Sequence, residues 1–322
     1  MRISNTCIRL LAAACLAAPC AAIAQDYPNK TIRIIVPQNP GGTADTIGRQ
    51  IAQHFAGAFK QPVVVENRPG GQSMIGTAAV ARSAPDGHTL LLGVPSLAIF
   101  DLLLKEPEID ALKELSAVAQ LVAVPWMIAV SAALPVNNLM EFIAYARANP
   151  GKLNYSALGG NQMMSVELFA RVAGISLVRV NYVGEAKAVP ALLTNEVQLT
   201  FATPGAIASM GQSGKIKVLA SSAAHLRNPA MPDVPAAAEA GLQNFDVVGW
   251  LGLLAPANTP IAIRRKLSGE VALWTKKPEV IEYARRVGFA AQSSTPEEFA
   301  AVLAMDNKRW TEIGRLVGIE KQ

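Results

Sequence analysis

The sequence has almost no cysteine, and none beyond its first twenty residues. Its three cysteines are Cys7, Cys15 and Cys20, so the chain after this point cannot form a disulfide framework. Long apolar runs are missing too, since no stretch after residue 24 approaches the roughly 20 apolar residues that a transmembrane helix needs. The folded part of this chain must therefore depend on its hydrophobic core.

The first 24 residues have the pattern of a secretory signal peptide. Two arginines precede a short apolar run over residues 10–18, and the small-x-small sequence Ala22-Ile23-Ala24 stands before Gln25. We expect cleavage there and export to the periplasm. Lipid attachment at Cys15 or Cys20 is the alternative, and it is disfavoured because neither cysteine has Leu, Val or Ile three residues before it.

The chain also has little net charge. Of its 29 Lys and Arg residues, Arg2 and Arg9 lie in the leader, which leaves 27 basic against 24 acidic residues. The adjacent basic pairs lie far apart and have no aromatic residues between them, so nucleic-acid binding is not expected. The length that remains of the 322 residues is enough for two domains, each with its own core.

Signatures of catalysis are absent as well. No GxSxG elbow, HExxH motif, paired-carboxylate signature or phosphate-binding GxxxxGK[ST] loop occurs, and Gly41-Gly42 does not match GxGxxG. His54, His88 and His225 lack the spacing of metal ligands. We therefore expect neither an enzyme, nor a metal, nor a cofactor.

The sequence does contain a strand, a glycine loop and a helix in immediate succession. Thr31–Val36 is short and β-branched, and PQNPGG follows it. Four apolar residues then recur at every fourth position from Ile47 to Phe59, with Gly42 or Thr43 as the N-cap. Such a helix start directs unpaired N–H groups at whatever lies above the sheet, and this predicts an anion cradle.

The same succession recurs along the chain, which predicts α/β layers with mainly parallel sheets. A late strand and three helices close the sequence and must return to the first unit. The chain would then cross between two lobes twice, near residues 124–125 and 248–249, as a paired hinge. The further strands are expected at 62–66, 88–94, 127–131, 153–157, 177–182, 197–202, 216–221 and 247–254, and the closing helices at 261–274, 278–287 and 296–317.

Several ordered motifs resemble the Bug-type receptors, the TctC-like extracytoplasmic binding proteins of tripartite tricarboxylate transport systems. They are PQNPGGTADTIGRQIA, VVVENRPGG, IGTAAVARSAPDGHTLLLG, MPDVPAAAEAGL, GWLGLLAPANTP and STPEEFAAVL, and together they cover nearly the whole chain after the leader. The resemblance implies an α/β, two-lobed periplasmic binding protein of type II (Venus-flytrap) with two crossing segments. Residues 1–24 would be the signal peptide, 25–124 and 249–322 lobe 1, and 125–248 lobe 2.

The resemblance also implies a cleft for a small carboxylated solute, permease subunits in the membrane as partners, and a monomer. Members of this family resemble one another in holding a ligand carboxylate mostly with main-chain groups and water. Carried over by position, the ligand loops would be Asn39–Thr43, Gly71–Ile75, Val94–Leu97, Leu158–Gln162, Val183–Lys187 and Ala202–Pro204. The first four contain no Arg or Lys, which agrees with binding by main-chain groups. The ligand-binding residues implied are Asn39, Gly41, Gly42, Thr43, Asp45, Ser73, Met74, Ser96, Gly159, Gly160, Asn161, Gln162, Met163, Val183, Gly184, Lys187, Ala202 and Thr203.

Three positions depart from the family pattern. The family commonly has Asp where Ala202 stands, and many members have His at Met163 and Lys at Val183. Each change replaces a polar group of the expected cleft by an apolar one. We hypothesise a ligand without an ammonium group and with an aromatic or otherwise apolar body. Drift at positions that do not contact the ligand is the alternative.

Other residues have two interpretations each. Asp45 either compensates the helix dipole or accepts from a ligand hydroxyl or a water, and Lys187 is either a surface lysine or pairs with the far carboxylate of a diacid. Met163 and Met164 would be part core and part pocket wall, and Trp250 would pack at the hinge or stack on ligand.

The function of the whole protein also has an alternative. Instead of delivering its ligand to a transporter, the receptor would present its ligand-bound form to a membrane kinase as a sensor.

Overall fold

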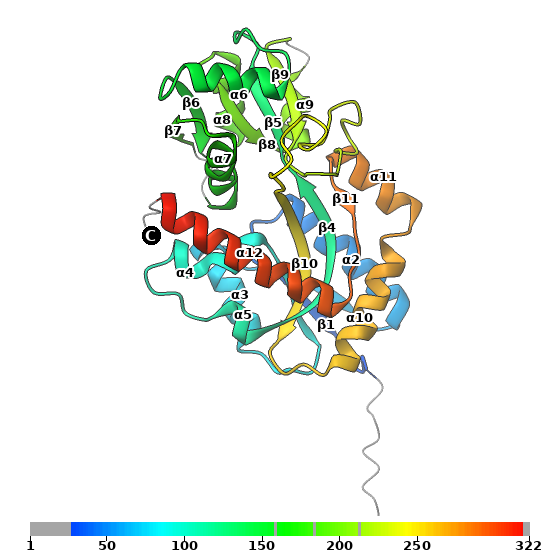
Figure 1. Cartoon of the computed structure of the whole chain (residues 1–322). Helices are drawn as coiled ribbons and strands as arrows, with labels where there is room; N and C mark the ends of the chain where they lie inside the picture. Colours follow the sequence, from blue (N-terminus) through cyan, green and yellow to red (C-terminus); the bar gives the residue numbers. More distant parts are fainter. Residues whose placement is uncertain (1–26, 158–159, 183–184, 212–213, 318–322) are drawn as a thin grey trace, which may run out of the picture.

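The computed structural model describes residues 27–157, 160–182, 185–211 and 214–317, and these form two α/β lobes, one above the other (Figure 1). We call the unit built on the six-stranded sheet lobe 1 and the unit built on the five-stranded sheet lobe 2. Within the described ranges, no helix has both the length and the apolar character needed to cross a membrane.

Lobe 1 has strand order β11-β4-β10-β3-β1-β2. β1 lies between β2 and β3 and is parallel to both, whereas β10 runs antiparallel to β3 and β4. Its strands are β1 (Ile32–Val36), β2 (Val63–Asn67), β3 (Thr89–Gly93), β4 (Leu115–Pro125), β10 (Val248–Pro256) and β11 (Ala290–Ala291). Its helices are α2 (Thr43–Phe59), η1 (Gly71–Ser73), α3 (Met74–Ala81), η2 (Pro95–Ile99), α4 (Phe100–Leu103), α5 (Ala111–Glu114), α10 (Ile261–Trp274), α11 (Pro278–Val287) and α12 (Pro296–Val317).

Lobe 2 has strand order β7-β6-β8-β5-β9. β6 is parallel to β7 and β8, and β5 is antiparallel to β8 and β9. Its strands are β5 (Met127–Ser131), β6 (Leu153–Ala157), β7 (Leu177–Asn181), β8 (Leu199–Ala202) and β9 (Ile216–Ser221), and its helices are α6 (Leu139–Ala148), α7 (Gly160–Ala173), α8 (Glu185–Leu193) and α9 (Pro204–Gly211).

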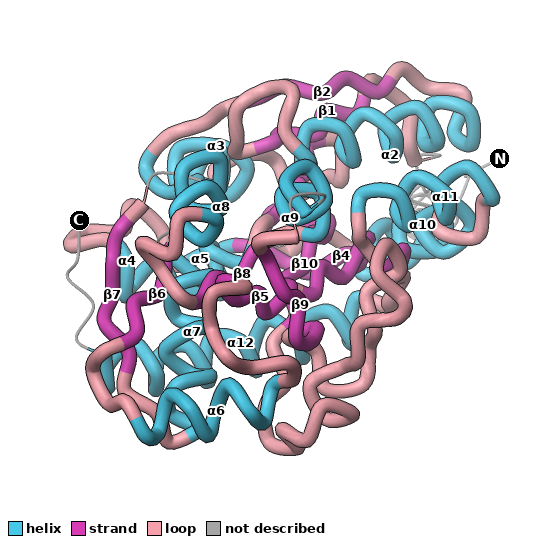
Figure 2. Tube along the Cα trace, turned by 90° about the horizontal axis from the view of Figure 1, so that it is seen from above, coloured by secondary structure: helices cyan, strands magenta, loops and turns pink. Residues whose placement is uncertain are grey.

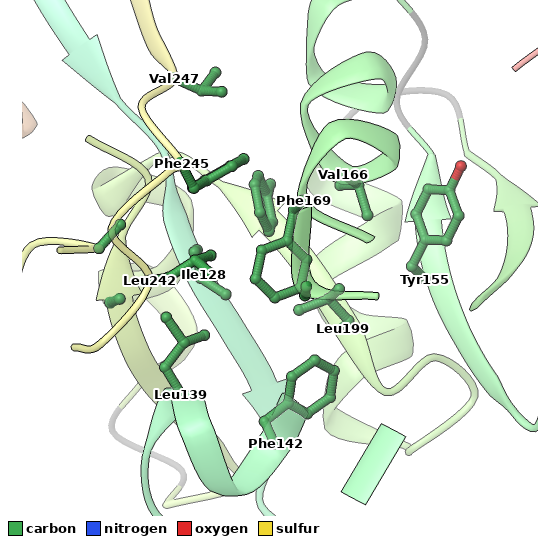
Figure 3. Packing of buried hydrophobic residues seen from close by; sticks show 14 of the residues in the cluster. Ile128, Leu139, Phe142, Tyr155, Val166, Phe169, Leu199, Leu242, Phe245 and Val247 are labelled. Atoms are coloured by element: carbon green, nitrogen blue, oxygen red, sulfur yellow. The ribbon is translucent and has the colours of Figure 1, made fainter. Parts of the chain in front are cut away.

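The core of lobe 2 is built around aromatic rings (Figure 3). Phe169 of α7 lies 5.6 Å from Phe245 and 6.4 Å from Phe142 of α6, measured between ring centroids. All three are fully buried. Since a buried aromatic side chain removes a large apolar area from water, these contacts fix α7 on the sheet.

The expectation of mainly parallel sheets is wrong, because both sheets are mixed. The strands that carry the chain between the lobes cause the difference. β4 and β5 are separated only by Trp126, so one extended segment leaves lobe 1 and enters lobe 2. β10 brings the chain back and pairs antiparallel with β4, from Val248 opposite Pro125 to Pro256 opposite Leu115. The paired crossing expected from the sequence is therefore a two-stranded ribbon.

The C-terminal helix α12 makes a further link between the lobes, which was not predicted from the sequence. Its first half packs in lobe 1, where Phe299 contacts Trp250 edge-on with ring centroids 5.1 Å apart. Its second half places Trp310 and Ile313 in the core of lobe 2, and Figure 1 shows the helix running below α7. The helix is 22 residues long, about 33 Å, which is enough to reach both cores.

Candidate functional site

Six loops follow the carboxyl ends of parallel strands, three in each lobe. β3, β1 and β2 are neighbours in lobe 1, and β7, β6 and β8 are neighbours in lobe 2. Because parallel neighbours end at the same sheet edge, each set of loops gathers at one edge. Seen from above, α8 and α9 lie over α3 and the start of α2, and Figure 1 shows that the two sets belong to lobes at different heights. The described helix starts that follow these strands in lobe 2 thus face those of lobe 1.

The loop between β1 and α2 is held by an acidic residue of α2. Gly42 is the N-cap and, as a glycine, has no side chain that could cap the helix, but Asp45 accepts a hydrogen bond from the Gly41 N–H, with Oδ2 at 3.0 Å. Asp45 is buried and pairs with Arg49, whose guanidinium holds the pKa of the Asp45 carboxyl below its usual range. Asn39, Gly41, Gly42 and Thr43 are exposed around it. Arg49 was not predicted from the sequence, although its i,i+4 spacing from Asp45 could have indicated the pair.

The loop between β2 and α3 has an unusual backbone. Gly70, Gly71, Gln72 and Ser73 all have positive φ, and the last two are not glycine, at 55° and 81°. Such a run is costly and occurs where the surroundings impose it, often at functional sites. Ser96, in η2 after β3, donates to the Gln72 carbonyl at 3.1 Å and so joins two of the loops.

The first turn of α3 has one buried and one exposed apolar side chain. Met74 is buried, whereas Ile75 is 52% exposed. A large exposed apolar residue at the edge of a loop cluster gives a ligand an apolar surface to contact. Ile75 lies in a predicted loop but was not among the predicted ligand-binding residues.

In the first turn of α7, two predicted residues contact lobe 2 itself. Gln162 is buried and its Nε2 donates to the Phe201 carbonyl at 2.6 Å, which ties the start of α7 to β8. Met163 is also buried, and its sulfur accepts a hydrogen bond from Arg179 Nη1 at 3.4 Å. Asn161 and Gly160 are partly exposed at the helix start. Arg179, a cation that contacts the first turn of α7 through Met163, was not predicted from the sequence.

The remaining predicted residues lie at α8 and α9. Lys187 is exposed, Ala202 is fully buried, and Thr203 Oγ1 accepts from the Ala206 N–H at 3.4 Å as a cap of α9. Because Ala202 lies in an apolar cluster with Met127, it has no surface exposed to a ligand in this conformation. Gly159, Val183 and Gly184 fall outside the described residues. The predicted binding role of each residue stays a prediction.

The described ranges were also compared with the requirements of metal binding. Within them no group of three or more His, Cys, Asp and Glu side chains could hold a metal ion. Trp250 is only 2% exposed and donates from Nε1 to Asp306 Oδ2 at 2.7 Å, which fits packing at the crossing strands. A groove of about 530 Å³ lies elsewhere, between α7 and α12, and a second one of about 630 Å³ lies between α2 and α10–α11.

Comparison with known proteins gives one consistent result. The model of the tripartite tricarboxylate transporter family receptor matches residues 47–319. Protein BugT of Bordetella pertussis is 31% identical over 312 residues, which cover 96% of this chain and 95% of BugT.

Solved structures agree with the sequence relatives. The R. palustris protein Rpa4515 with adipate is 28% identical, with a TM-score of 0.75 over 92% of this chain and 100% of that one. The periplasmic binding protein BugD is 28% identical, with a TM-score of 0.71 over 92% and 100%. MatC from Rhodopseudomonas palustris, with bound malate, is 29% identical, with a TM-score of 0.69 over 89% and 100%.

Proposed function

The chain belongs to the tripartite tricarboxylate transporter receptor family, whose members are periplasmic solute-binding receptors and not enzymes, and from this premise we propose its specific role. The protein captures a small carboxylated solute between its two lobes and delivers it to permease subunits of a tripartite tricarboxylate-type transporter. It acts as a monomer, and residues 1–24 direct its export and are removed. N-terminal sequencing of the exported protein should then begin at Gln25.

The observation that supports this role best is that the two lobes bring helix starts toward each other. Each lobe brings helix starts to the carboxyl edge of its sheet, on the side that faces the other lobe. Helix starts bind anions because their first N–H groups have no partner within the helix. The two relatives whose structures hold adipate and malate bind carboxylates on the same fold.

Energetics require closure of the lobes around the ligand. A partly buried helix end contributes about 1 to 2 kcal/mol to an anion, so three ends give about 3 to 6 kcal/mol. Micromolar affinity needs about 8 kcal/mol before ordering costs. Burying about 150 Å² of ligand carbon adds about 4 kcal/mol. Only contacts from both lobes can cover that much of a small acid.

We further propose that the ligand has an apolar body and no ammonium group. Ile75 offers an exposed apolar surface at the loop cluster, and Met163 stands where many members of the family have His. Ala202 does not add to this argument, because it is fully buried. An ammonium group would need acidic partners, and Asp45, the acid nearest to the first loop, is already paired with Arg49. Adipate and malate, bound by the two relatives, likewise carry no ammonium group.

A thermal-shift panel tests the proposed function and the ligand class together. Aliphatic diacids, branched and aromatic monoacids, aspartate and glutamate would each be titrated, and stabilisation of the folded protein grows with ligand concentration over Kd. We expect the apolar acids to raise the Tm most. Preference for aspartate or glutamate would refute the apolar-body hypothesis, and no shift with any acid would refute carboxylate binding. Native mass spectrometry of protein taken from the periplasm would then identify the retained acid.

A further inference from the structure

The first ligand loop already contains an anion that belongs to the protein. Asp45 is 4% exposed, and its Oδ2 accepts a hydrogen bond from the Gly41 N–H just before the start of α2. Its Oδ1 receives no aligned hydrogen bond, although Arg49 Nη2 lies 3.0 Å away. A bare carboxylate at this point would repel the carboxylate of a ligand held by the same loop.

Arg49 balances this charge from one turn further along α2. Its Nε lies 3.1 Å from Asp45 Oδ2, so the guanidinium contacts both carboxylate oxygens. Its Nη2 also donates to Asn67 Oδ1 at 3.4 Å, and Asn67 Nδ2 donates to the Gln38 carbonyl at 3.1 Å. These contacts connect the end of β2, the helix and the β1–α2 loop into one polar network.

The neighbouring charges do not replace Arg49. Glu66 and Arg68, at the end of β2, pair with each other, with Arg68 Nε 2.6 Å from Glu66 Oε1. The charge that the loop presents to a ligand is therefore set by the Asp45–Arg49 pair.

We propose that Arg49 is a positioning residue that masks the charge of Asp45, so that the loop can fix its backbone with an internal carboxylate and still accept an acidic ligand. This inference rests on the proposed function. Asp45 would hold the Gly41 N–H and shape the loop, and Arg49 would cancel the repulsion that this arrangement creates. Neither residue needs to touch the ligand.

The expected effect can be worked out for an assumed separation of about 8 Å between the Asp45 carboxylate and a ligand carboxylate held by the same loop. At the effective dielectric constant of about 20 that suits protein sites, an unbalanced charge at that separation weakens binding by about 10- to 30-fold. Removing both charges together should restore the affinity, because an Asn side chain can still accept from the Gly41 N–H. A purely structural role of Arg49 predicts no such recovery.

A double-mutant cycle distinguishes these cases. Kd for adipate and for benzoate would be measured by calorimetry for the wild type, Arg49→Gln, Asp45→Asn and the double variant. Arg265→Gln serves as the matched control, because Arg265 is an exposed partner of Glu297, at 2.8 Å, elsewhere in lobe 1.

We expect Arg49→Gln to bind at least 10-fold more weakly and the double variant to return to within about threefold of the wild type. Asp45→Asn should bind more tightly than the wild type, because it leaves the positive charge of Arg49 unbalanced, and Arg265→Gln should keep the wild-type affinity. Unchanged binding by Arg49→Gln, or a double variant as weak as Arg49→Gln, overturns the masking role while the proposed function stands. A wild type that binds neither acid overturns the masking role, and only failure of the whole acid panel overturns the proposed function as well.

Discussion

Replacing Trp250 by Phe tests the contact between the crossing strand β10 and the helix that reaches both lobes. Trp250 Nε1 donates to Asp306 Oδ2 at 2.7 Å, and both side chains are buried. Phe keeps a ring that can pack against Phe299 but removes the indole N–H that donates to Asp306. Loss of a hydrogen bond to a buried carboxylate costs about 1.5 to 3 kcal/mol of the unfolding free energy.

The cost should depend on pH, and its sign follows from the environment of Asp306. Burial raises the pKa of the Asp306 carboxyl above its ordinary value of 3.8, and the Trp250 hydrogen bond opposes that rise. A carboxyl whose folded pKa is raised stabilises the fold fully below its ordinary pKa, and this stability is lost as pH rises through the folded pKa. Without the indole the pKa rises further. The destabilisation by Trp250→Phe should thus be small near pH 4 and larger at pH 7.

Urea unfolding from pH 4 to pH 8 measures the unfolding free energy of the variant and of the wild type. The contributions of all other titrating groups cancel when one free energy is subtracted from the other. Asp306→Asn is the control, because a neutral amide can still accept from Trp250 but cannot titrate. In that background the cost of Trp250→Phe should be smaller and independent of pH. An equal cost at pH 4 and pH 7 in the Asp306 background would refute the coupling between the indole N–H and the charge of Asp306.

Two further substitutions test how the lobes are joined. Trp310→Ala should lower the unfolding free energy, measured by urea unfolding, by about 3 to 5 kcal/mol, because the Trp310 side chain is only 3% exposed and packs in the lobe 2 core. Leu273→Ala is the control and should change the unfolding free energy little, because Leu273 is 56% exposed. Gly288→Ala should cost about 1 to 3 kcal/mol and widen the angle between the lobes in X-ray scattering, because Gly288 has φ of 79° and an added Cβ would lie 2.3 Å from Pro204 Cγ across the lobes. If the scattering curve does not change, the added methyl group is accommodated by a local shift of Pro204 and the angle between the lobes stays the same.

Much of the fold is predictable because local patterns and tertiary packing agree. The helices α10, α11 and α12 have the predicted limits, and proline or an apolar stripe marks each of them. β6 and β9 also match the prediction. At these places the local sequence pattern is sufficient to define the element.

β4 and α9 are missing from the prediction for a physical reason. β4 is an 11-residue apolar run, LSAVAQLVAVP, without alternation, and it is buried on both faces between β10 and β11. Such a run has no period that distinguishes strand from helix. Helix α9 is short and begins at Pro204 directly after β8, so little sequence separates the two elements.

The candidate site is predictable at the level of loops but not of side chains. Glycine and proline mark the loops, and the sheet brings them together. The partners of individual residues depend on packing across the chain, as in the contact of Gln162 with Phe201 or of Met163 with Arg179. The Asp45–Arg49 pair, in contrast, is local enough to be predicted from its i,i+4 spacing.

The buried cluster of lobe 2 is completed by chain from outside that lobe. Ile99 and Leu103 precede the first crossing and Trp310 and Ile313 follow the second, yet all four lie in this cluster. A fragment of residues 125–248 would therefore expose an unfilled apolar face and should not fold alone. For the intact chain, calorimetry should show one cooperative melting transition, since neither half can lose its structure without uncovering the other.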